Sequence, residues 1–187
     1  VVDGPCHRHG VAGLALHELA VVVQRVVDVQ GKLDAVLGLG VVLDEVGQRQ
    51  AGRIFTTMLL VCPDGLGERV FSTDPVAYPM PHRKPFPESG WKEQVIEAAR
   101  PSLSRNMQEY LQVHIGRVVF EALGAGCLLN MPAVHAGAVV GVVNIGAVEH
   151  AYDASTVAML TPLVAAIAPS FALLRQRLEL GTPFRAS

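Results

Sequence analysis

Apolar positions in the first part of the chain recur at the spacing of amphipathic helices. Over residues 11–30, leucine and valine return every three or four positions with charged and amide residues between them, which predicts a helix. A second helix is predicted over residues 32–49, and Gly31 between the two is typical of a helix end. Residues 1–10 contain glycine and proline and predict a tail. We therefore expect a helical arm ahead of the rest of the fold.

From Gly52 onward the pattern becomes that of strands. Residues 54–61 are apolar and β-branched, residues 68–73 follow, and a Pro-Asp-Gly turn separates them, which predicts a β-hairpin. Residues 74–90 are so rich in proline that neither a helix nor a central strand is compatible with them. We expect this segment to be a long ordered loop.

Shorter elements are predicted in the middle of the chain. Residues 91–100 have the pattern of a short amphipathic helix, which Pro101 ends. Residues 102–105 are compatible with a short strand, and residues 107–123 resemble a helix that breaks near Gly116.

Two long apolar runs, residues 127–134 and 138–148, predict a second hairpin with Gly137 at a positive φ in its turn. Both faces of the second run are apolar, so the sheet is expected to be covered on both sides. The last helix is predicted to begin at the N-cap Asp153 and to end near Leu178. Because the strands come in hairpins, the predicted class is α+β with an antiparallel sheet.

Composition narrows the class of protein. The chain has 187 residues, enough for one ordinary domain or one domain and an arm, and 50% of them are hydrophobic, which argues against disorder. A net charge of −2 excludes a strongly basic nucleic-acid-binding protein. The three cysteines lie far apart without a Cys-x-x-Cys pair, so neither a disulfide framework nor a structural zinc site is expected, and a reducing cytoplasm fits best. The first residues lack the basic and apolar regions of a signal peptide.

One segment raises the question of a membrane. Residues 154–174 contain no charged side chain and are long enough to span a bilayer. The run is interrupted by Pro162 and Pro169 and is rich in alanine, and Pro162 is expected to kink or restart the helix. We interpret the segment as a buried helix, with a membrane span as the alternative.

Several sequence blocks resemble a known family. Residues 127–134, a strand ending in a Pro-apolar pair, are followed by Ala136–Ile145, a glycine turn and a Val-Gly-apolar strand. Tyr152–Val157 is similar to the entry into the last helix of GAF domains, and Pro101–Asn106 to their short middle strand. On these residues the chain resembles a GAF domain over about residues 32–179.

The resemblance implies a GAF-like (profilin-like) six-stranded antiparallel sheet with helices on both faces. It implies a tail and helix over residues 1–31 at a dimer interface, a GAF-like domain over 32–180, and a tail over 181–187. In this family the terminal helices often pair with a partner subunit, and the other face of the sheet makes a pocket for a small ligand. Phe71–Pro79 and Arg83–Pro85 further resemble a subgroup of stand-alone bacterial GAF proteins of unassigned activity.

The better-known activities of the family can be compared with these residues. The Asn-Lys…Phe…Asp-Glu pattern of cyclic-nucleotide GAF domains is not found. Bilin attachment uses a cysteine next to a histidine. Neither Cys62 nor Cys127 has that neighbour, and Cys6 lies outside the domain that resembles the family. Free methionine sulfoxide reductases carry cysteines in the middle loops, where only Cys127 comes near, without an apparent resolving partner.

The predicted loop offers candidate ligand-binding groups. Tyr78 has an aromatic face, and the cations Arg83 and Lys84 suit an anionic ligand such as a carboxylate or phosphate, although a solvated basic surface has the same composition. Trp91, the only tryptophan, is predicted to be a stacking wall or a core anchor. Arg105 is predicted either to face the ligand or to lie on the surface.

Two polar residues, Asn130 and Asn144, interrupt the apolar runs of the second hairpin and need hydrogen-bond partners. If residue 130 pairs with residue 144, the two side chains are cross-strand neighbours. A register shifted by one residue puts them on opposite faces. The sequence leaves both registers open.

The sequence gives little support for a metal site or for the common catalytic and phosphate-binding motifs. The cluster Cys6-His7-Arg8-His9 holds potential metal ligands, but they are too close together to complete a tetrahedral shell. No metal site is predicted, and no Ser-His-Asp grouping, Gly-x-Gly-x-x-Gly motif or phosphate-binding loop is found.

The sequence therefore predicts a non-catalytic, cofactor-free module that binds or senses a small ligand between the sheet and residues 74–91. It is expected to be a cytoplasmic homodimer that pairs through its terminal helices, without nucleic-acid or membrane partners. The alternatives are a thiol-dependent reductase that uses Cys127 and a structural or interaction protein with a vestigial pocket.

Overall fold

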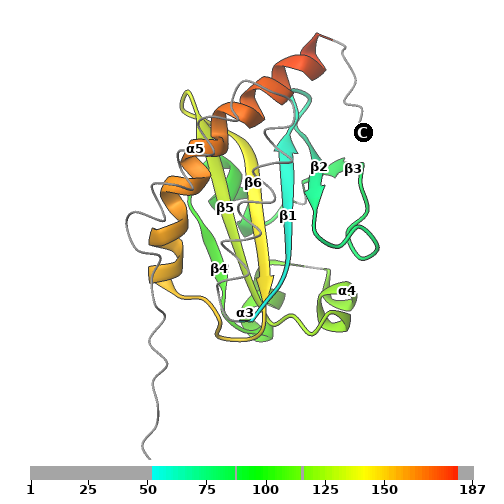
Figure 1. Cartoon of the computed structure of the whole chain (residues 1–187), viewed down its shortest axis with the longest axis vertical. Coiled ribbons are helices and arrows are strands. Elements are labelled where there is room, and N and C mark those ends of the chain that lie inside the picture. The colour runs from blue at the N-terminus through cyan, green and yellow to red at the C-terminus, as the bar shows by residue number, and fades with distance from the viewer. Residues whose placement is uncertain (1–51, 87, 115, 181–187) are drawn as a thin grey trace, which may run out of the picture.

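The computed structural model of the chain describes residues 52–86, 88–114 and 116–180 (Figure 1). The predicted arm over residues 1–31, with its cysteine and histidine cluster, the predicted helix over residues 32–49 and the tail over residues 181–187 lie outside these ranges. The described elements follow in the order β1 (Arg53–Val61), β2 (Leu66–Ser72), β3 (His82–Pro85), η1 (Lys92–Glu97), β4 (Ser102–Ser104), α3 (Met107–Val113), α4 (Arg117–Ala122), β5 (Cys127–His135), β6 (Ala138–Ala147) and α5 (Ala154–Glu179).

The strands form one six-stranded sheet in the order β3-β2-β1-β6-β5-β4, and every neighbouring pair is antiparallel. Both predicted hairpins are present, as β1 with β2 and β5 with β6. The predicted α+β class with an antiparallel six-stranded sheet is therefore confirmed.

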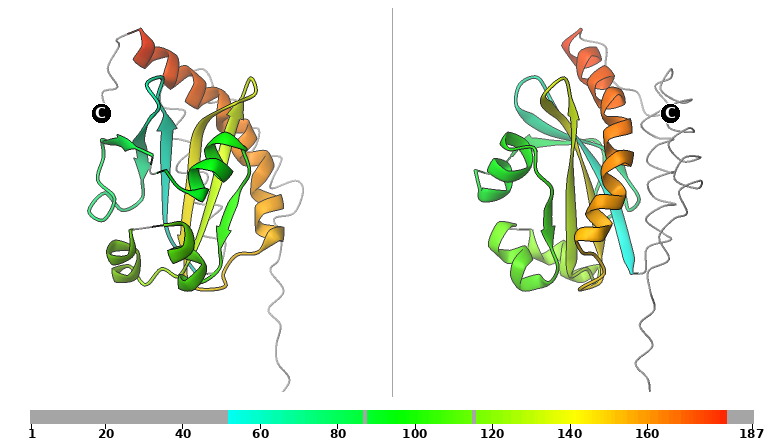
Figure 2. Two further views of the ribbon diagram at one scale, coloured as in Figure 1. Left: turned by 180° about the vertical axis from the view of Figure 1, so that it is seen from behind. Right: turned by 90° about the vertical axis from the view of Figure 1, so that its left-hand side faces the viewer.

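Helices lie on both sides of this sheet. Figure 2 shows α5 running along one face, while α3 and α4 lie on the other. The two faces of the sheet can therefore serve different purposes, one packing the long helix and the other meeting the short middle elements.

The face toward α5 carries the largest apolar core. Alternate residues of β1, β5 and β6 point toward α5 and pack against its inner side, as expected for strands covered by a helix. Gly141 of β6 allows the closest approach, because a Cβ atom there would lie 2.5 Å from the Phe171 ring. We call this set the α5-side cluster; among its members are Met58, Leu60, Leu129, Met131, Val143, Ile145, Leu163, Ile167 and Phe171.

The opposite face carries two smaller clusters, one toward each end of the strands. The Trp91 cluster packs η1 on the sheet, and the Tyr110 cluster packs α3 and α4 on it. The buried members of the Trp91 cluster are Val61, Trp91, Val95, Val139 and Val142; those of the Tyr110 cluster are Phe55, Tyr110, Phe120, Ala125 and Leu128.

The segment predicted as a loop over residues 74–90 contains the edge strand β3, so that prediction was incomplete. Among the described strands, β3 pairs with β2 only, and Pro85 lies opposite Leu66 at its end. Proline is tolerated there because an edge strand leaves one row of N–H positions without a ladder partner. The proline content argued correctly against a central strand but could not exclude an edge strand.

The second hairpin turns through Ala136 and Gly137, both at positive φ (50° and 80°). This is the backbone of a two-residue hairpin turn, and the predicted positive φ at Gly137 is confirmed. Next to the turn, Val134 pairs with Val139, but beyond it Ala133 pairs with Gly141. One extra residue on β6 therefore makes a β-bulge that shifts the register of the rest of the hairpin.

α5 begins as predicted at Asp153, whose side chain accepts hydrogen bonds from the backbone N–H groups of Ser155 (2.8 Å) and Thr156 (3.2 Å). The helix continues through Pro162 and Pro169 instead of restarting, and Pro162 lies on its exposed side. In the described part of the chain, α5 is the one helix whose length and composition would allow it to cross a bilayer. The packing of its inner side on the sheet accounts for the apolar residues on that side.

Candidate functional site

A row of polar side chains crosses the sheet between the two smaller clusters. Strand pairing places Thr57 of β1 opposite Asn144 of β6, Asn144 opposite Asn130 of β5, and Asn130 opposite Ser102 of β4. Asn130 Nδ2 donates to Asn144 Oδ1 (2.7 Å), and Asn144 Nδ2 donates to Thr57 Oγ1 (3.1 Å). We call Thr57, Asn144 and Asn130 the polar ladder.

The polar ladder exists because of the bulge in the second hairpin. Counted from its two-residue turn, the hairpin would place residue 130 opposite residue 143, and the extra residue on β6 moves the partner to Asn144. This settles the question that the sequence left open, since the two asparagines share a face and bind each other.

The side chains of the polar ladder point away from α5. Met58 and Val143, each next to a ladder residue along its strand, belong to the α5-side cluster, and successive side chains of a strand alternate between faces. The ladder therefore lies on the face that η1 and α3 cover, with the Trp91 cluster on one side and the Tyr110 cluster on the other.

Aromatic rings gather at this covered face. Trp91, directly ahead of η1, is 6% exposed, and its ring centre lies 6.3 Å from that of His114, which follows α3. The His114 ring stacks on Tyr110 at 4.7 Å, and Tyr110 stacks on Phe120 at 4.1 Å. The Tyr110 hydroxyl donates to the Gly116 carbonyl (3.0 Å), which fixes this ring.

Three buried polar atoms at this place make no hydrogen bond of ordinary length and angle among the described residues: Trp91 Nε1, His114 Nε2 and Asn130 Oδ1. His114 and Asn130 are neighbours, because a side-chain hydrogen bond with Asn130 opposes the lowering of the His114 pKa, and the Trp91 ring lies beside the His114 ring. Buried polar groups without partners are uncommon in native proteins, and several together call for a bound molecule or water.

The site is electrically neutral at physiological pH. Burial lowers the pKa of His114 from its ordinary 6.5 to about 4, and the neighbouring Asn130 side chain opposes the shift only in part. No charged side chain contributes to this pKa, so within the described ranges no formal charge lies close to the ring. His114 is therefore an uncharged imidazole that can accept or donate a hydrogen bond.

The structure brings three of the predicted ligand-binding residues to this place: Trp91, Asn130 and Asn144. Tyr78 lies on the same face but toward the β2 side, where its ring packs on Phe55 (4.5 Å between ring centres) and carries the Arg69 guanidinium at 5.2 Å.

The two predicted cations, Arg83 and Lys84, are consecutive residues of β3 and point to opposite faces of the sheet. Arg83 pairs with Glu68 across β3 and β2, and its guanidinium forms ion pairs with Glu68 (3.5 Å) and with Asp64. Glu68 in turn lies opposite Leu60, on the α5 side of the sheet. Lys84, the next residue of β3, points to the other face at the exposed edge. The two cations therefore do not form one anion-binding clamp.

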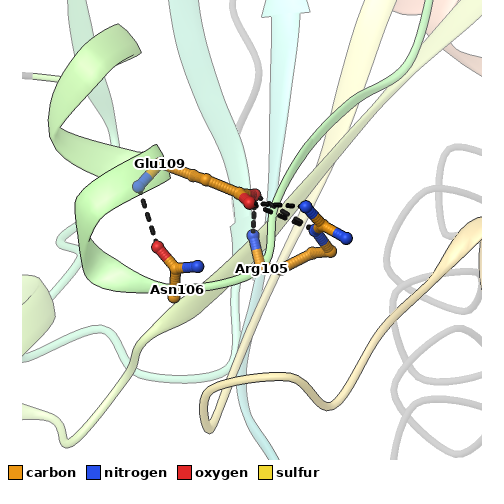
Figure 3. A network of polar contacts seen from close by, with 3 residues as sticks. All are labelled: Arg105, Asn106 and Glu109. Carbon is orange, nitrogen blue, oxygen red and sulfur yellow. Dashed lines mark hydrogen bonds and ion pairs between the residues drawn. The ribbon is translucent and has the colours of Figure 1, made fainter.

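Arg105 forms hydrogen bonds with Glu109 at the start of α3. Its guanidinium donates to Glu109 (2.7 Å), its backbone N–H donates to the same carboxylate (2.8 Å), and Asn106 accepts from the Glu109 N–H (2.9 Å) (Figure 3). The Arg105 hydrogen bonds lower the pKa of Glu109. This exposed network caps α3, so the structure gives Arg105 a partner of its own rather than a place beside the polar ladder.

The sequence did not single out His114, Thr57 or Tyr110 as parts of a site. Thr57 is one of many polar residues in strands, and His114 seemed isolated because its neighbours lie far along the chain. Strand-face alternation in residues 54–61 could have suggested Thr57, but no local signal pairs His114 with Asn130.

Two cysteines lie on the other side of the sheet. Cys127 and Cys62 are members of the α5-side cluster, with 0% and 1% of their surfaces exposed. Burial raises the pKa of each thiol to about 11. Both are therefore protonated and shielded at neutral pH. Within the described ranges, no three His, Cys, Asp or Glu side chains gather as metal ligands would.

Comparison with solved structures places this architecture among known folds. The GAF domain of an Acinetobacter phosphoenolpyruvate-protein phosphotransferase superposes with a TM-score of 0.63 at 13% identity, covering 86% of this chain and 94% of that one. Free methionine-R-sulfoxide reductase of Neisseria meningitidis, in complex with its substrate, also gives 0.63 at 16% identity, covering 84% and 88%. A further GAF domain structure gives 0.62 at 12% identity, covering 91% and 98%.

No curated protein matches the chain significantly. A family model does match, over residues 17–171, and its description is GAF domain. Most of the chain lies inside this match, and the strand order and covering helices agree with the solved GAF structures. The chain belongs to the GAF domain family.

Proposed function

We propose that this GAF domain is a non-catalytic binding module for a small molecule, held between the polar ladder and the cover formed by Trp91 and His114. The observation that carries the proposal is Trp91 Nε1, which is buried without a partner in the described ranges. It lies beside His114, whose Nε2 atom and its neighbour Asn130 Oδ1 make no hydrogen bond of ordinary length and angle. A ligand-binding regulatory role is the general role of the fold, and the polar ladder supports the proposed location.

Energetics favour a bound partner at this location. A buried donor or acceptor without a hydrogen bond costs about 1–3 kcal/mol, which is a large fraction of the free energy of unfolding of a marginally stable domain. A molecule that supplies hydrogen bonds to these atoms recovers that free energy on binding. The fold accommodates small molecules elsewhere, since the reductase of Neisseria meningitidis was solved with its substrate.

The position of Cys127 does not support the alternative of a thiol-dependent reductase. The Cys127 thiol lies behind the sheet, on the α5 side, with no exposed surface. Its raised pKa of about 11 keeps the thiolate, the reactive form, at a very low population at neutral pH. We therefore propose no catalytic role for it.

The binding proposal can be tested by mass spectrometry of molecules released from the purified full chain. We expect a small molecule to be released from the wild-type protein and to be largely lost in Asn130→Leu, which keeps the side-chain volume but removes the amide. Thr56→Val is the matched control, because Thr56 is a buried residue of β1 with an unpartnered hydroxyl and its cross-strand partner, Ile145, belongs to the α5-side cluster.

Equal retention of the molecule by Asn130→Leu would place its binding elsewhere. If nothing is released and no small molecule raises the unfolding temperature of the wild-type chain, the structural or interaction role becomes the better explanation.

Thiol labelling tests the reductase alternative directly. In a Cys6→Ser background, Cys62 and Cys127 should react with an aromatic disulfide reagent only after denaturation, because both thiols are buried and protonated. Rapid labelling of Cys127 in the folded protein at pH 7, together with methionine sulfoxide turnover that Cys127→Ser abolishes, would restore the enzyme hypothesis.

A further inference from the structure

We propose that Arg69, His82 and Lys84 form a binding site for a phosphate group at the edge of the sheet where β2 pairs with β3. Figure 1 shows these two strands side by side at that edge. The site lies on the same face of the sheet as the polar ladder but on other strands, and it does not depend on the proposed function.

Strand pairing brings the three basic side chains together on one face. Arg69 of β2 lies directly opposite His82 of β3, and Lys84 follows two residues after His82. Directly opposed residues have Cβ atoms about 5 Å apart, and residues two apart on a strand point to the same side about 7 Å apart. Arg69 also lies opposite Leu59, which packs in the Trp91 cluster, so this face is the one away from α5.

The Arg69 guanidinium is held in place by its surroundings. It lies over the Tyr78 ring, 5.2 Å from the ring centre, and its Nη1 donates to the Pro79 carbonyl (2.9 Å). Its Nε is buried and makes no hydrogen bond among the described residues, whereas Nη2 makes none there and is not buried. Nη2 is therefore a positioned donor that a ligand can reach from solvent, with little side-chain freedom to lose on binding.

This half-buried cation lacks a counter-ion. In the part of the chain that the structure describes, neither Arg69 nor His82 nor Lys84 forms an ion pair with a carboxylate. Asp74, at the start of the segment that carries Tyr78, accepts hydrogen bonds from two backbone N–H groups of its own turn (3.1 Å and 2.9 Å). Burial lowers the pKa of Arg69, which shows that its charge is partly desolvated. A bound anion would supply the missing negative charge.

His82 and Lys84 complete the site from the edge strand, where both side chains are exposed. Burial lowers the pKa of His82, and the charges of Arg69 and Lys84 lower it further, so both cations act on the imidazole. At neutral pH His82 is therefore uncharged and donates from one nitrogen, while Arg69 and Lys84 contribute two fixed positive charges. Two charges suit a phosphate group, which carries nearly two negative charges, better than a carboxylate, which carries one.

Arg83, between His82 and Lys84 in the sequence, provides an internal comparison. It points to the opposite face and forms ion pairs with Asp64 and with Glu68 (3.5 Å). The sequence favoured an anionic ligand at Arg83 and Lys84. Our proposal keeps Lys84 in that role and replaces the already paired Arg83 with Arg69 and His82.

Titration of the isotope-labelled full chain with inorganic phosphate at neutral pH and constant ionic strength, followed through backbone amide NMR signals, tests the site. We expect saturable shifts in β2 and β3, and binding of acetate weaker by about fivefold because it carries a single charge. Arg69→Gln should weaken phosphate binding about tenfold, since it removes a charge-assisted hydrogen bond. Lys84→Gln should weaken it about two- to fivefold, the effect of one exposed ion pair.

Arg83→Gln is the matched control, because it removes the same charge from the adjacent residue on the opposite face, and the phosphate affinity should stay within about twofold of the wild type. An equal loss in Arg83→Gln and Lys84→Gln would indicate a diffuse positive field and overturn the inference. Acetate binding as tightly as phosphate, or no saturable shift in the wild type, would overturn it too. Lys84→Gln keeps the test decisive if Arg69→Gln does not fold, because Lys84 is exposed.

Glycerol phosphate distinguishes two sources of the phosphate group. Tighter binding of this ester than of inorganic phosphate would support the site and identify an organic phosphate as its ligand. Equal or weaker binding of the ester would support the site with the free ion as its ligand.

Discussion

His114 is half-buried, with its Nε2 atom away from solvent, and this residue links the site to the stability of the domain. Its pKa is about 4 in the folded protein against 6.5 ordinarily, because burial penalises the imidazolium. The unfolded chain therefore binds a proton more readily between these two values. The contribution to stability is complete above pH 6.5 and is lost as the pH falls toward 4.

This predicts a measurable pH dependence. Between pH 7 and 4 the free energy of unfolding of the wild-type protein should fall by about 2–3 kcal/mol more than that of His114→Gln, whose side chain does not titrate. His135→Gln, at an exposed hairpin position, is the control and should follow the wild type. Urea titrations at several pH values measure this. Parallel profiles for wild type and His114→Gln would show that His114 is not protonated selectively in the unfolded chain.

At the scale of elements, the contact between α5 and β6 depends on a residue without a side chain. The Phe171 ring occupies the space that a Cβ atom of Gly141 would need, at 2.5 Å. Phe171 is 1% exposed and surrounded by the α5-side cluster, so it has little freedom to move away. The helix can lie this close to the sheet only while position 141 is glycine.

Gly141→Ala should therefore destabilise the domain by about 1–3 kcal/mol through overpacking. Gly90→Ala is the matched control, since a Cβ atom there meets nothing within 4 Å, and its effect should stay within about 0.5 kcal/mol. Chemical denaturation of both variants measures the difference. Equal stability of Gly141→Ala and the wild type would mean that α5 shifts at no cost.

At the scale of the whole molecule, the two faces of the sheet have different roles. Among the described residues, one face packs the long helix α5, and the other carries the polar ladder under short helices (Figure 2). α5 also has an apolar side chain exposed to solvent, since Leu173 is 50% exposed. The homodimer predicted from the sequence, paired through the helices over residues 11–47 and 154–179, would cover this surface.

We expect the full chain to have the mass of a dimer by light scattering and Leu173→Glu to shift it toward a monomer, because a carboxylate at a packed interface is costly to bury. Val118→Glu is the control, at a residue that is 81% exposed on α4, on the opposite face of the sheet. A monomeric wild-type chain would refute the dimer, and dissociation caused by Val118→Glu instead would move the interface to the other face.

The parts of the fold that were predictable are those with local causes. Asp153 caps α5 through backbone groups two and three residues away, and Ala136 with Gly137 forms a turn from its own dihedral preferences. Hydrophobic periodicity marks the strands of both hairpins for the same reason. β3 was not predicted, because this edge strand forms only where β2 offers free hydrogen-bonding groups. The proline-rich sequence of β3 gives no sign of that pairing.

The amino-acid sequence alone thus determined the class, the hairpins and the family, because short-range preferences and apolar patterning suffice for these. Only the tertiary structure decided the site. The bulge in β6 chose the register that joins Asn130 to Asn144, the alternation of β3 separated Arg83 from Lys84, and packing brought Trp91 and His114 over the ladder. Each of these depends on contacts between distant segments, whose free energies are set by the assembled core and not by any one stretch of chain.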